Sequence, residues 1–277
     1  MVFSECNFFR DNTMDLNKNF ETLFYTEKNS IGYITLNRPD VHNAFNGDLI
    51  NELFDIFKIL KELKDLRIIV LTGNGKSFCA GADLNWMKSV VNYSYRQNFE
   101  ESLKLAELMN LIFTHPKPVI ARVNGSAIGG GVGLMAACDI VIASDNAKFG
   151  LTEVKLGLAP SVISPYVISR IGVTNARDLF ITGERITAHK AFAIKLVNQV
   201  VGDEELDNAV NQKINMILSS GPDAVKAIKE LIFNVTIPHF EQIRNYTSEL
   251  IANLRLSSEG QEGMNSYLEK RKPYWSN

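Results

Sequence analysis

The sequence predicts an α/β fold followed by a helical C-terminal region, and three observations support this prediction. Between about residues 31 and 143, short β-branched runs alternate with longer helical patterns, as in repeated βαβ units. Past Gly172 such runs nearly vanish and amphipathic helical patterns dominate. The chain has 277 residues, 45% hydrophobic and 22% charged, which is an ordinary globular composition and enough for one large core.

The first half of the chain contains four runs that predict the strands of a largely parallel sheet. The run from Ile68 to Leu71 is continuously apolar, which is typical of a strand covered on both faces. Apolar residues recur at helical spacing between residues 50 and 63, and a second helix is predicted from near residue 96 to residue 113. The predicted strands cover residues 31–36, 67–71, 118–123 and 139–143.

The second half of the chain predicts helices, and Pro222 and Pro238 stand where they would end one helix and begin the next. Three parts of the chain are therefore expected. Residues 1–22 are polar and predict a flexible N-terminal extension, residues 23–202 form the α/β core, and residues 203–277 form the helical C-terminal region. The predicted helices cover residues 175–182, 189–195, 204–219 and 223–234, and the last begins at residue 240.

The composition argues against several classes of function. The net charge is -2 and the basic residues are scattered, so no nucleic-acid or anionic membrane partner is expected. No run reaches the roughly 20 apolar residues of a transmembrane helix. The N-terminus lacks a secretory pattern and the three cysteines lack C-x-x-C spacing, which favours a reducing, cytoplasmic location. The four histidines are widely spaced, so no metal site is expected.

A glycine-rich segment at residues 124–133 is the most unusual feature of the chain. Five of the 18 glycines lie within nine positions, after an apolar strand and before an apolar helix. Backbone amides in such a turn can approach a ligand closely, and the first amides of a helix favour an anion or oxyanion. Glycines that merely permit close helix packing would give the same pattern, so this segment alone leaves both interpretations open.

A second segment of small residues, at residues 78–84, follows the strand that ends near Leu71. Ligands of open α/β sheets bind at the carboxyl ends of the strands, so the two segments can face one crevice and supply two amides to one oxygen, such as that of a developing enolate. The sequence Gly75-Lys76-Ser77 imitates the end of a phosphate-binding loop. Such a loop needs a glycine where Val70 stands, which excludes a nucleotide hydrolase of that kind.

Several short motifs follow one another along the chain: Asn37-Arg38-Pro39, Asn43-Ala44, Ala80-Gly81-Ala82-Asp83, Asn124-Gly125, Gly129-Gly130-Gly131, Cys138-Asp139, Phe149-Gly150 with Glu153, and the C-terminal Glu262-Gly263-Met264 and Glu269-Lys270-Arg271. Their order resembles the crotonase, or enoyl-CoA hydratase/isomerase, superfamily. The resemblance covers the chain from about residue 31 to the C-terminus. It implies a crotonase-like spiral of ββα turns, a helical C-terminal region that mediates trimerisation, and a homotrimer or dimer of trimers. It also implies an acyl-CoA substrate with no separate cofactor.

The resemblance also implies roles for individual residues. The oxyanion hole falls on the backbone amides of Ala82 and Gly130, and the acid–base group is Glu153. Asp83 is further expected to cap a short helix that begins at Leu84. Coenzyme A is expected to pass over Val41, Ala80, Asp83 and Leu84, with Lys270 reaching its nucleotide phosphates.

Typical hydratases of this superfamily carry two glutamates, and here Gly133 replaces the first of them. The expected activity is hydration of the 2,3 double bond of an acyl-CoA thioester by one glutamate. Double-bond isomerisation and a non-catalytic binding role stay open as alternatives. Segments 82–88 and 156–166 resemble bacterial methylglutaconyl-CoA hydratases of leucine breakdown. We therefore expect the substrate pocket to include Asn85, Gly133, Ser161 and Ser164, with a distal carboxylate of the substrate helping to order the attacking water.

Overall fold

The computed structural model describes residues 20–236 and 240–273. The extension predicted over residues 1–22 therefore lies mostly outside the described residues. Its last residues do not extend away from the fold, because the backbone amides of Glu21 and Thr22 donate hydrogen bonds to the Glu52 carboxylate at 2.8 and 2.9 Å. Phe20 also packs against the main core. Residues 20–22 therefore lie against the fold, and strand β1 begins at Leu23, where the predicted core begins.

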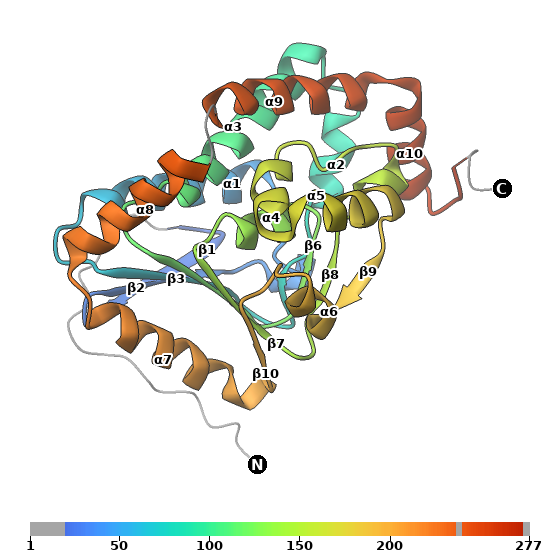
Figure 1. Ribbon diagram of the computed structural model, residues 1–277. Coiled ribbons are helices and arrows are strands. Elements are labelled where there is room, and N and C mark those ends of the chain that lie inside the picture. Colours follow the sequence, from blue (N-terminus) through green and yellow to red (C-terminus); the bar gives the residue numbers. More distant parts are fainter. Residues whose placement is uncertain (1–19, 237–239, 274–277) are drawn as a thin grey trace.

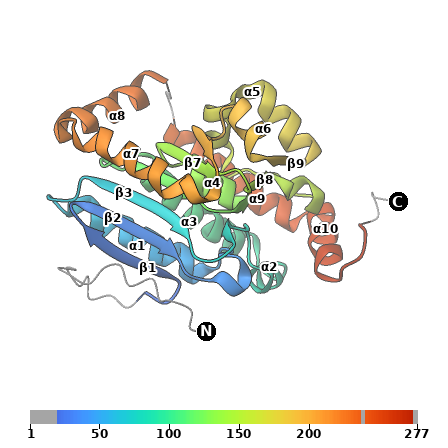
Figure 2. The same cartoon turned by 90° about the horizontal axis from the view of Figure 1, so that it is seen from below.

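Two sheets form the core of the protein (Figures 1 and 2). The larger sheet has the strand order β1-β2-β3-β5-β7-β10, in which only the β1–β2 pair is antiparallel. The smaller sheet has the order β4-β6-β8-β9, with β9 antiparallel to β8. The strands are β1 (Leu23–Lys28), β2 (Ile31–Leu36), β3 (Ile68–Gly73), β4 (Ser77–Cys79), β5 (Val119–Val123), β6 (Ser126–Ile128), β7 (Ile140–Ser144), β8 (Lys148–Gly150), β9 (Arg185–Thr187) and β10 (Gln199–Val201).

The chain runs through repeated ββα turns, which confirms the expected architecture. In three successive turns, which begin at β3, β5 and β7, the first strand joins the larger sheet, the next joins the smaller sheet, and a helical segment follows. The helical segments of the core are α1 (Gly47–Glu62), α2 (Leu84–Val90), α3 (Tyr95–Phe113), α4 (Gly130–Ala136), the 3-10 helix η2 (Thr152–Leu156), α5 (Ser164–Thr182) and α6 (Ala188–Ala193). The helix predicted from residue 175 begins earlier, at Ser164, and is interrupted at Gly172, whose φ of 70° is not helical.

Both faces of the larger sheet are covered, as the apolar run in β3 predicts. Ile69 and Leu71 lie in the main core. Ile68 and Val70 point to the other face and pack in a second cluster with residues of α7, including Leu206. A strand with alternate side chains in two separate cores has no solvent-facing side, which explains why its sequence shows no polar alternation.

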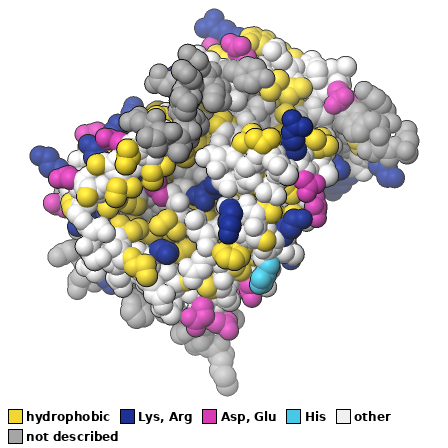
Figure 3. Space-filling model, viewed as in Figure 1, with side chains coloured by type: hydrophobic (Ala, Val, Ile, Leu, Met, Phe, Trp, Pro, Cys, Tyr) yellow, Lys and Arg dark blue, Asp and Glu magenta, His cyan; other side chains and the backbone are white. Residues whose placement is uncertain are grey.

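All the described elements from Asp203 onward are helical: the 3-10 helix η3 (Asp203–Glu205), α7 (Leu206–Leu218), α8 (Pro222–Thr236), α9 (Phe240–Leu256) and α10 (Ser258–Leu268). Helix α9 lies along α3 in Figure 1. Helices α7 and α8 carry exposed apolar side chains, among them Met216, Ile228 and Leu231. Figure 3 shows hydrophobic side chains gathered on the side of the molecule where these two helices lie.

Helix α10 packs tightly against η2 through two glycines. A Cβ atom on Gly263 would lie 2.0 Å from the carbonyl oxygen of Leu156. A Cβ atom on Gly157 would lie 2.7 Å from the carbonyl oxygen of Glu259. The two segments therefore touch backbone to backbone. None of the helices in the described parts of the chain combines the length and the apolar character needed to cross a membrane.

Candidate active site

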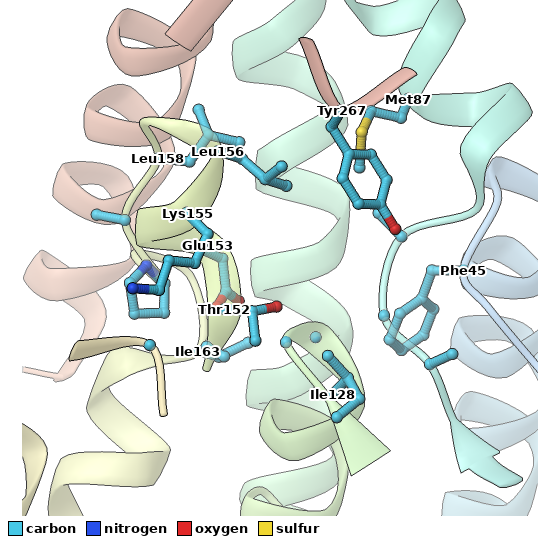
Figure 4. A pocket seen from close by; sticks show the side chains of 18 of the residues that line it. Phe45, Met87, Ile128, Thr152, Glu153, Lys155, Leu156, Leu158, Ile163 and Tyr267 are labelled. Carbon is cyan, nitrogen blue, oxygen red and sulfur yellow. The ribbon is translucent and has the colours of Figure 1, made fainter. Parts of the chain in front are cut away.

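A cavity of about 910 Å³ lies between the two segments singled out in the sequence and the C-terminal helices. Its wall includes Ala82, Gly130 and Glu153, so the structure brings the three residues predicted for the chemistry to one place. Figure 4 shows Glu153, Thr152 and Ile163 on one side of this cavity and Phe45, Met87 and Tyr267 on the other. Leu156 and Leu158 add an apolar wall between them.

Neither the Ala82 nor the Gly130 amide donates to a protein acceptor among the described residues. The backbone of Phe45 forms a parallel bridge to Ala82: its carbonyl accepts from the Asp83 amide at 2.9 Å, and its amide donates to the Gly81 carbonyl at 2.6 Å. The amide of Ala82 lies between these two hydrogen bonds and takes part in neither. Gly130 is the first residue of α4, where a helical amide has no partner within the helix. Two unused amides in the wall of one cavity can hold one oxygen atom.

The glycines beside these amides let three segments meet. A Cβ atom on Gly81 would lie 2.8 Å from the Ile128 carbonyl oxygen and 3.8 Å from the Gly130 nitrogen. A Cβ atom on Gly129 would lie 3.1 Å from Glu153 Oε1. Both glycines have positive φ angles, 89° and 52°, that favour glycine. The loop after β4, the start of α4 and the Glu153 carboxylate are therefore neighbours.

Glu153 lies in η2, and its carboxylate is held inside the protein. Oε2 is buried and has no hydrogen-bond partner among the described residues. Burial disfavours the charged form and raises the pKa of Glu153 to about 7. A carboxyl group with this pKa exists in both forms at neutral pH, so it can accept a proton in one step and return it in the next.

The Ala82 segment is fixed by Asp83. One carboxylate oxygen accepts from the amides of Asn85 and Trp86 at 2.7 and 3.3 Å, which caps α2 as predicted. The other accepts from Arg38 Nη2 at 2.8 Å. Burial alone would raise the pKa of Asp83, but these hydrogen bonds outweigh it and the pKa lies below its ordinary value. The side chain is thus occupied by structural contacts.

Gly133, which the sequence analysis assigns to the substrate pocket, is buried in α4 and does not itself line the cavity. A Cβ atom there would lie 2.0 Å from Ile163 Cγ2 and 2.5 Å from Ile163 Cβ. Ile163 itself does line the cavity. The space next to Gly133 is therefore filled by an isoleucine from the loop before α5, and the sequence analysis missed this residue.

The remaining predicted residues divide between the cavity and other parts of the surface. Ala80 and Ser161 line the cavity, whereas Ser164 donates its hydroxyl to the Ser161 carbonyl at 2.8 Å. Asn85, which the sequence analysis assigns to the substrate pocket, lines a separate hollow beside Arg38. Val41 and Leu84 are exposed, as is Lys270 just beyond α10, and none of the three is part of the cavity wall. Within residues 20–236 and 240–273, no three His, Cys, Asp or Glu side chains gather as metal ligands would.

Comparison with known proteins agrees with this geometry. The family described as enoyl-CoA hydratase/isomerase matches residues 26–277. A short-chain-enoyl-CoA hydratase from Clostridium acetobutylicum is 35% identical over 252 residues, which are 89% of this chain and 94% of that protein. A trans-2-decenoyl-[acyl-carrier-protein] isomerase from Streptococcus mutans is 31% identical, covering 92% of this chain and 97% of that protein.

Solved structures are similar over the same length. The crystal structure of an enoyl-CoA hydratase from Shewanella pealeana has a TM-score of 0.76 and 38% sequence identity to this chain, and the match covers 93% of this chain and 97% of that one. The similarity in sequence and the similarity in fold therefore indicate the same family. This chain is an enzyme that belongs to the enoyl-CoA hydratase/isomerase family.

Proposed function

We propose that the enzyme adds water across the 2,3 double bond of an acyl-CoA thioester, with Glu153 as its single acid–base group. The observation that carries this proposal is the meeting of two unused amides and one carboxyl group of raised pKa in the wall of one cavity. The amides of Ala82 and Gly130 hold the thioester oxygen. No separate cofactor takes part, because coenzyme A belongs to the substrate and the reaction moves only protons and water.

The reaction proceeds in two proton transfers. Ionised Glu153 removes a proton from water as the water oxygen bonds to C3, and the electrons of the double bond move toward the thioester oxygen. The two amides stabilise the negative charge that develops there. Protonated Glu153 then gives its proton to C2, and the carbonyl reforms. The product is a 3-hydroxyacyl-CoA, and Glu153 returns to its starting form.

The raised pKa of Glu153 supports a mechanism with one carboxylate. A group with a pKa of about 7 is neither too weak a base to activate water nor too weak an acid to protonate an enolate. Gly133 and Ile163 together leave an apolar surface where a second carboxylate would stand in a typical hydratase. Water must therefore be ordered by Glu153 and by the substrate itself.

Within this reaction, we propose 3-methylglutaconyl-CoA as the substrate, which would place the enzyme in leucine breakdown. The support is the resemblance of segments 82–88 and 156–166 to methylglutaconyl-CoA hydratases, and the absence of a second glutamate at Gly133. A carboxylate carried by the substrate could help order the attacking water. Ser161, which lines the cavity, remains a candidate contact for it, whereas Asn85 does not.

Isomerisation of the double bond is the second candidate, and the lone carboxylate favours it. In that reaction Glu153 removes a proton from C2 of a 3-enoyl thioester and returns it to C4, so the double bond moves without water. The isomerase from Streptococcus mutans among the relatives motivates this alternative. Both reactions place negative charge on the thioester oxygen, in an enolate during hydration and in a dienolate during isomerisation, so the oxyanion hole serves either.

We further propose that the chain assembles as a homotrimer or a dimer of trimers. Met216, Ile228 and Leu231 are each more than half exposed, and such large apolar side chains are typical of a surface that a partner covers (Figure 3). A Leu231→Asp variant is expected to lower the mass measured by sedimentation if α8 lies in the interface.

Lys270, beyond α10, is proposed to contact the nucleotide phosphates of coenzyme A.

The test is incubation of the protein with crotonyl-, 3-hexenoyl- and 3-methylglutaconyl-CoA in heavy-oxygen water, followed by mass analysis of the products. Incorporation of heavy oxygen into a 2-enoyl substrate supports hydration, and migration of the 3-hexenoyl double bond without incorporation supports isomerisation. Glu153→Gln should abolish whichever conversion is seen. Turnover of none of the three thioesters would refute the proposal.

A further inference from the structure

A positively charged side chain, Arg255 of α9, lies in the wall of the cavity. Its guanidinium carbon is 5.5 Å from the centre of the Trp86 ring, and Nη1 donates to Ser102 Oγ at 3.3 Å. Trp86 and Ser102 line the same cavity, as do the apolar Leu105 and Ile251. The guanidinium therefore sits among cavity-facing groups, between α3 and α9.

Arg255 has no carboxylate within ion-pair distance among the side chains that the structure describes. The nearby acid is Glu101, which accepts from Trp86 Nε1 at 3.3 Å and pairs with Lys104 at 3.8 Å. Burial lowers the pKa of Arg255 to about 10, although Glu101 opposes this shift, so the side chain is still charged at neutral pH. One long hydrogen bond leaves most of its five donors unused.

Arg170 shows how this fold satisfies a buried guanidinium when its role is structural. Its nitrogens donate to the carbonyl oxygens of Ala136, Cys138 and Asp139 and to Asn198 Oδ1. Arg255 is half-buried, so it loses part of its hydration and, without such partners, gains little in return. An anionic group entering the cavity would supply the missing partner, and a carboxylate matches the two-pronged donor geometry of arginine.

We propose that Arg255 binds a carboxylate at the far end of the acyl chain, so that the preferred substrates are enoyl-CoA thioesters whose acyl group ends in a carboxylate. This inference rests on the proposed function, since it requires the acyl chain to occupy this cavity. Ser102 Oγ, which accepts from Arg255, can donate its own proton to the same carboxylate. Lys155 and Arg185 also line the cavity, but they are exposed and already hydrated, so an ion pair there contributes little.

The test compares the binding of two unreactive thioesters by calorimetry. Glutaryl-CoA carries the terminal carboxylate, and 5-methylhexanoyl-CoA replaces it with an isopropyl group of the same shape. The wild-type protein is expected to bind glutaryl-CoA about 10–100-fold more tightly, which is the range of a charge-assisted hydrogen bond. Arg255→Met should remove this preference, and Arg255→Lys should retain part of it.

Two control variants locate the effect. Arg177→Met removes an exposed arginine from α5 and should leave the preference intact. Lys155→Met removes a charge from another part of the cavity wall. Loss of the preference in Lys155→Met but not in Arg255→Met would overturn the proposal, as would equal binding of the two thioesters by the wild type. Melting temperatures of all variants identify any that fail to fold, in which case Arg255→Lys carries the comparison.

The proposed function and this inference fail in different ways. If the wild type converts an uncharged enoyl thioester but binds both probes equally, only the role of Arg255 is wrong. If it binds neither probe and converts no thioester, the acyl site itself is wrong and both proposals fall.

Discussion

Replacing Gly133 by alanine should destabilise the protein, because the added Cβ would lie 2.0 Å from Ile163 Cγ2. Carbon atoms in contact normally lie about 3.5–4.0 Å apart, so one of the two segments must move by about 1.5 Å or more. Overpacking of this severity costs up to about 3 kcal/mol, and replacing a helical glycine by alanine returns about 1 kcal/mol. The free energy of unfolding should therefore fall by about 2 kcal/mol.

A double-mutant cycle with Ile163 tests this reasoning. In an Ile163→Gly background the clash is gone, so Gly133→Ala should be neutral or slightly stabilising. In an Ile163→Ala background the Cβ of residue 163 would still lie 2.5 Å away, so most of the cost should remain. Unfolding is followed by urea titration at one fixed protein concentration. If Gly133→Ala changed the free energy of unfolding by the same amount, within about 0.5 kcal/mol, in the wild type and in the Ile163→Gly background, the proposed contact would be refuted.

Four further predictions concern Glu153, the proposed acid–base group, and Asp83. Glu153→Gln should lower kcat for the reaction found by about 10²–10⁴-fold, as measured by steady-state kinetics, with little change in the melting temperature at low pH. The pKa of about 7 predicts that kcat/KM for hydration falls about tenfold per pH unit below 7. The pKa of Glu153 lies above its ordinary value of 4.5, so ionisation of this group opposes folding and the wild type loses stability as the pH rises from 4.5 to about 7. Glutamine does not ionise, so the free energy of unfolding of Glu153→Gln minus that of the wild type should rise over this range and be constant above it. Asp83→Ala should destabilise the protein more than Asp83→Asn, since asparagine can still cap α2 while both lose the ion pair with Arg38; equal melting temperatures would contradict this.

Strands β2, β3, β5 and β7 of the larger sheet could be predicted because they are five or six residues long and apolar enough to show a pattern. Strands β4, β6, β8 and β9 have three residues each, which is too short for any periodicity to appear. Strand β1 alternates in exposure, but Phe24 is apolar and exposed, so the residue types do not show this alternation.

The site was predictable only where a motif fixes the backbone. Ala82 and Gly130 supply amides, and glycines or small residues around them are visible in the sequence. Asn85 follows Ala82 closely in sequence, yet α2 begins at Leu84 and Asn85 lines a different hollow, which the sequence does not show. Ile163 and Arg255 gave no local signal, since their importance comes from what faces them across the fold.

The glycines at positions 157 and 263 allow α10 and η2 to press together without intervening side chains. The C-terminal helix and the carboxyl group of Glu153 are consequently parts of a single stiff unit. A substrate that displaced α10 would therefore also displace Glu153 from the substrate carbon to which it is proposed to transfer a proton. Under the proposed function, this contact should therefore limit the size of the acyl group, so that selection by size and the alignment of Glu153 depend on the same packing.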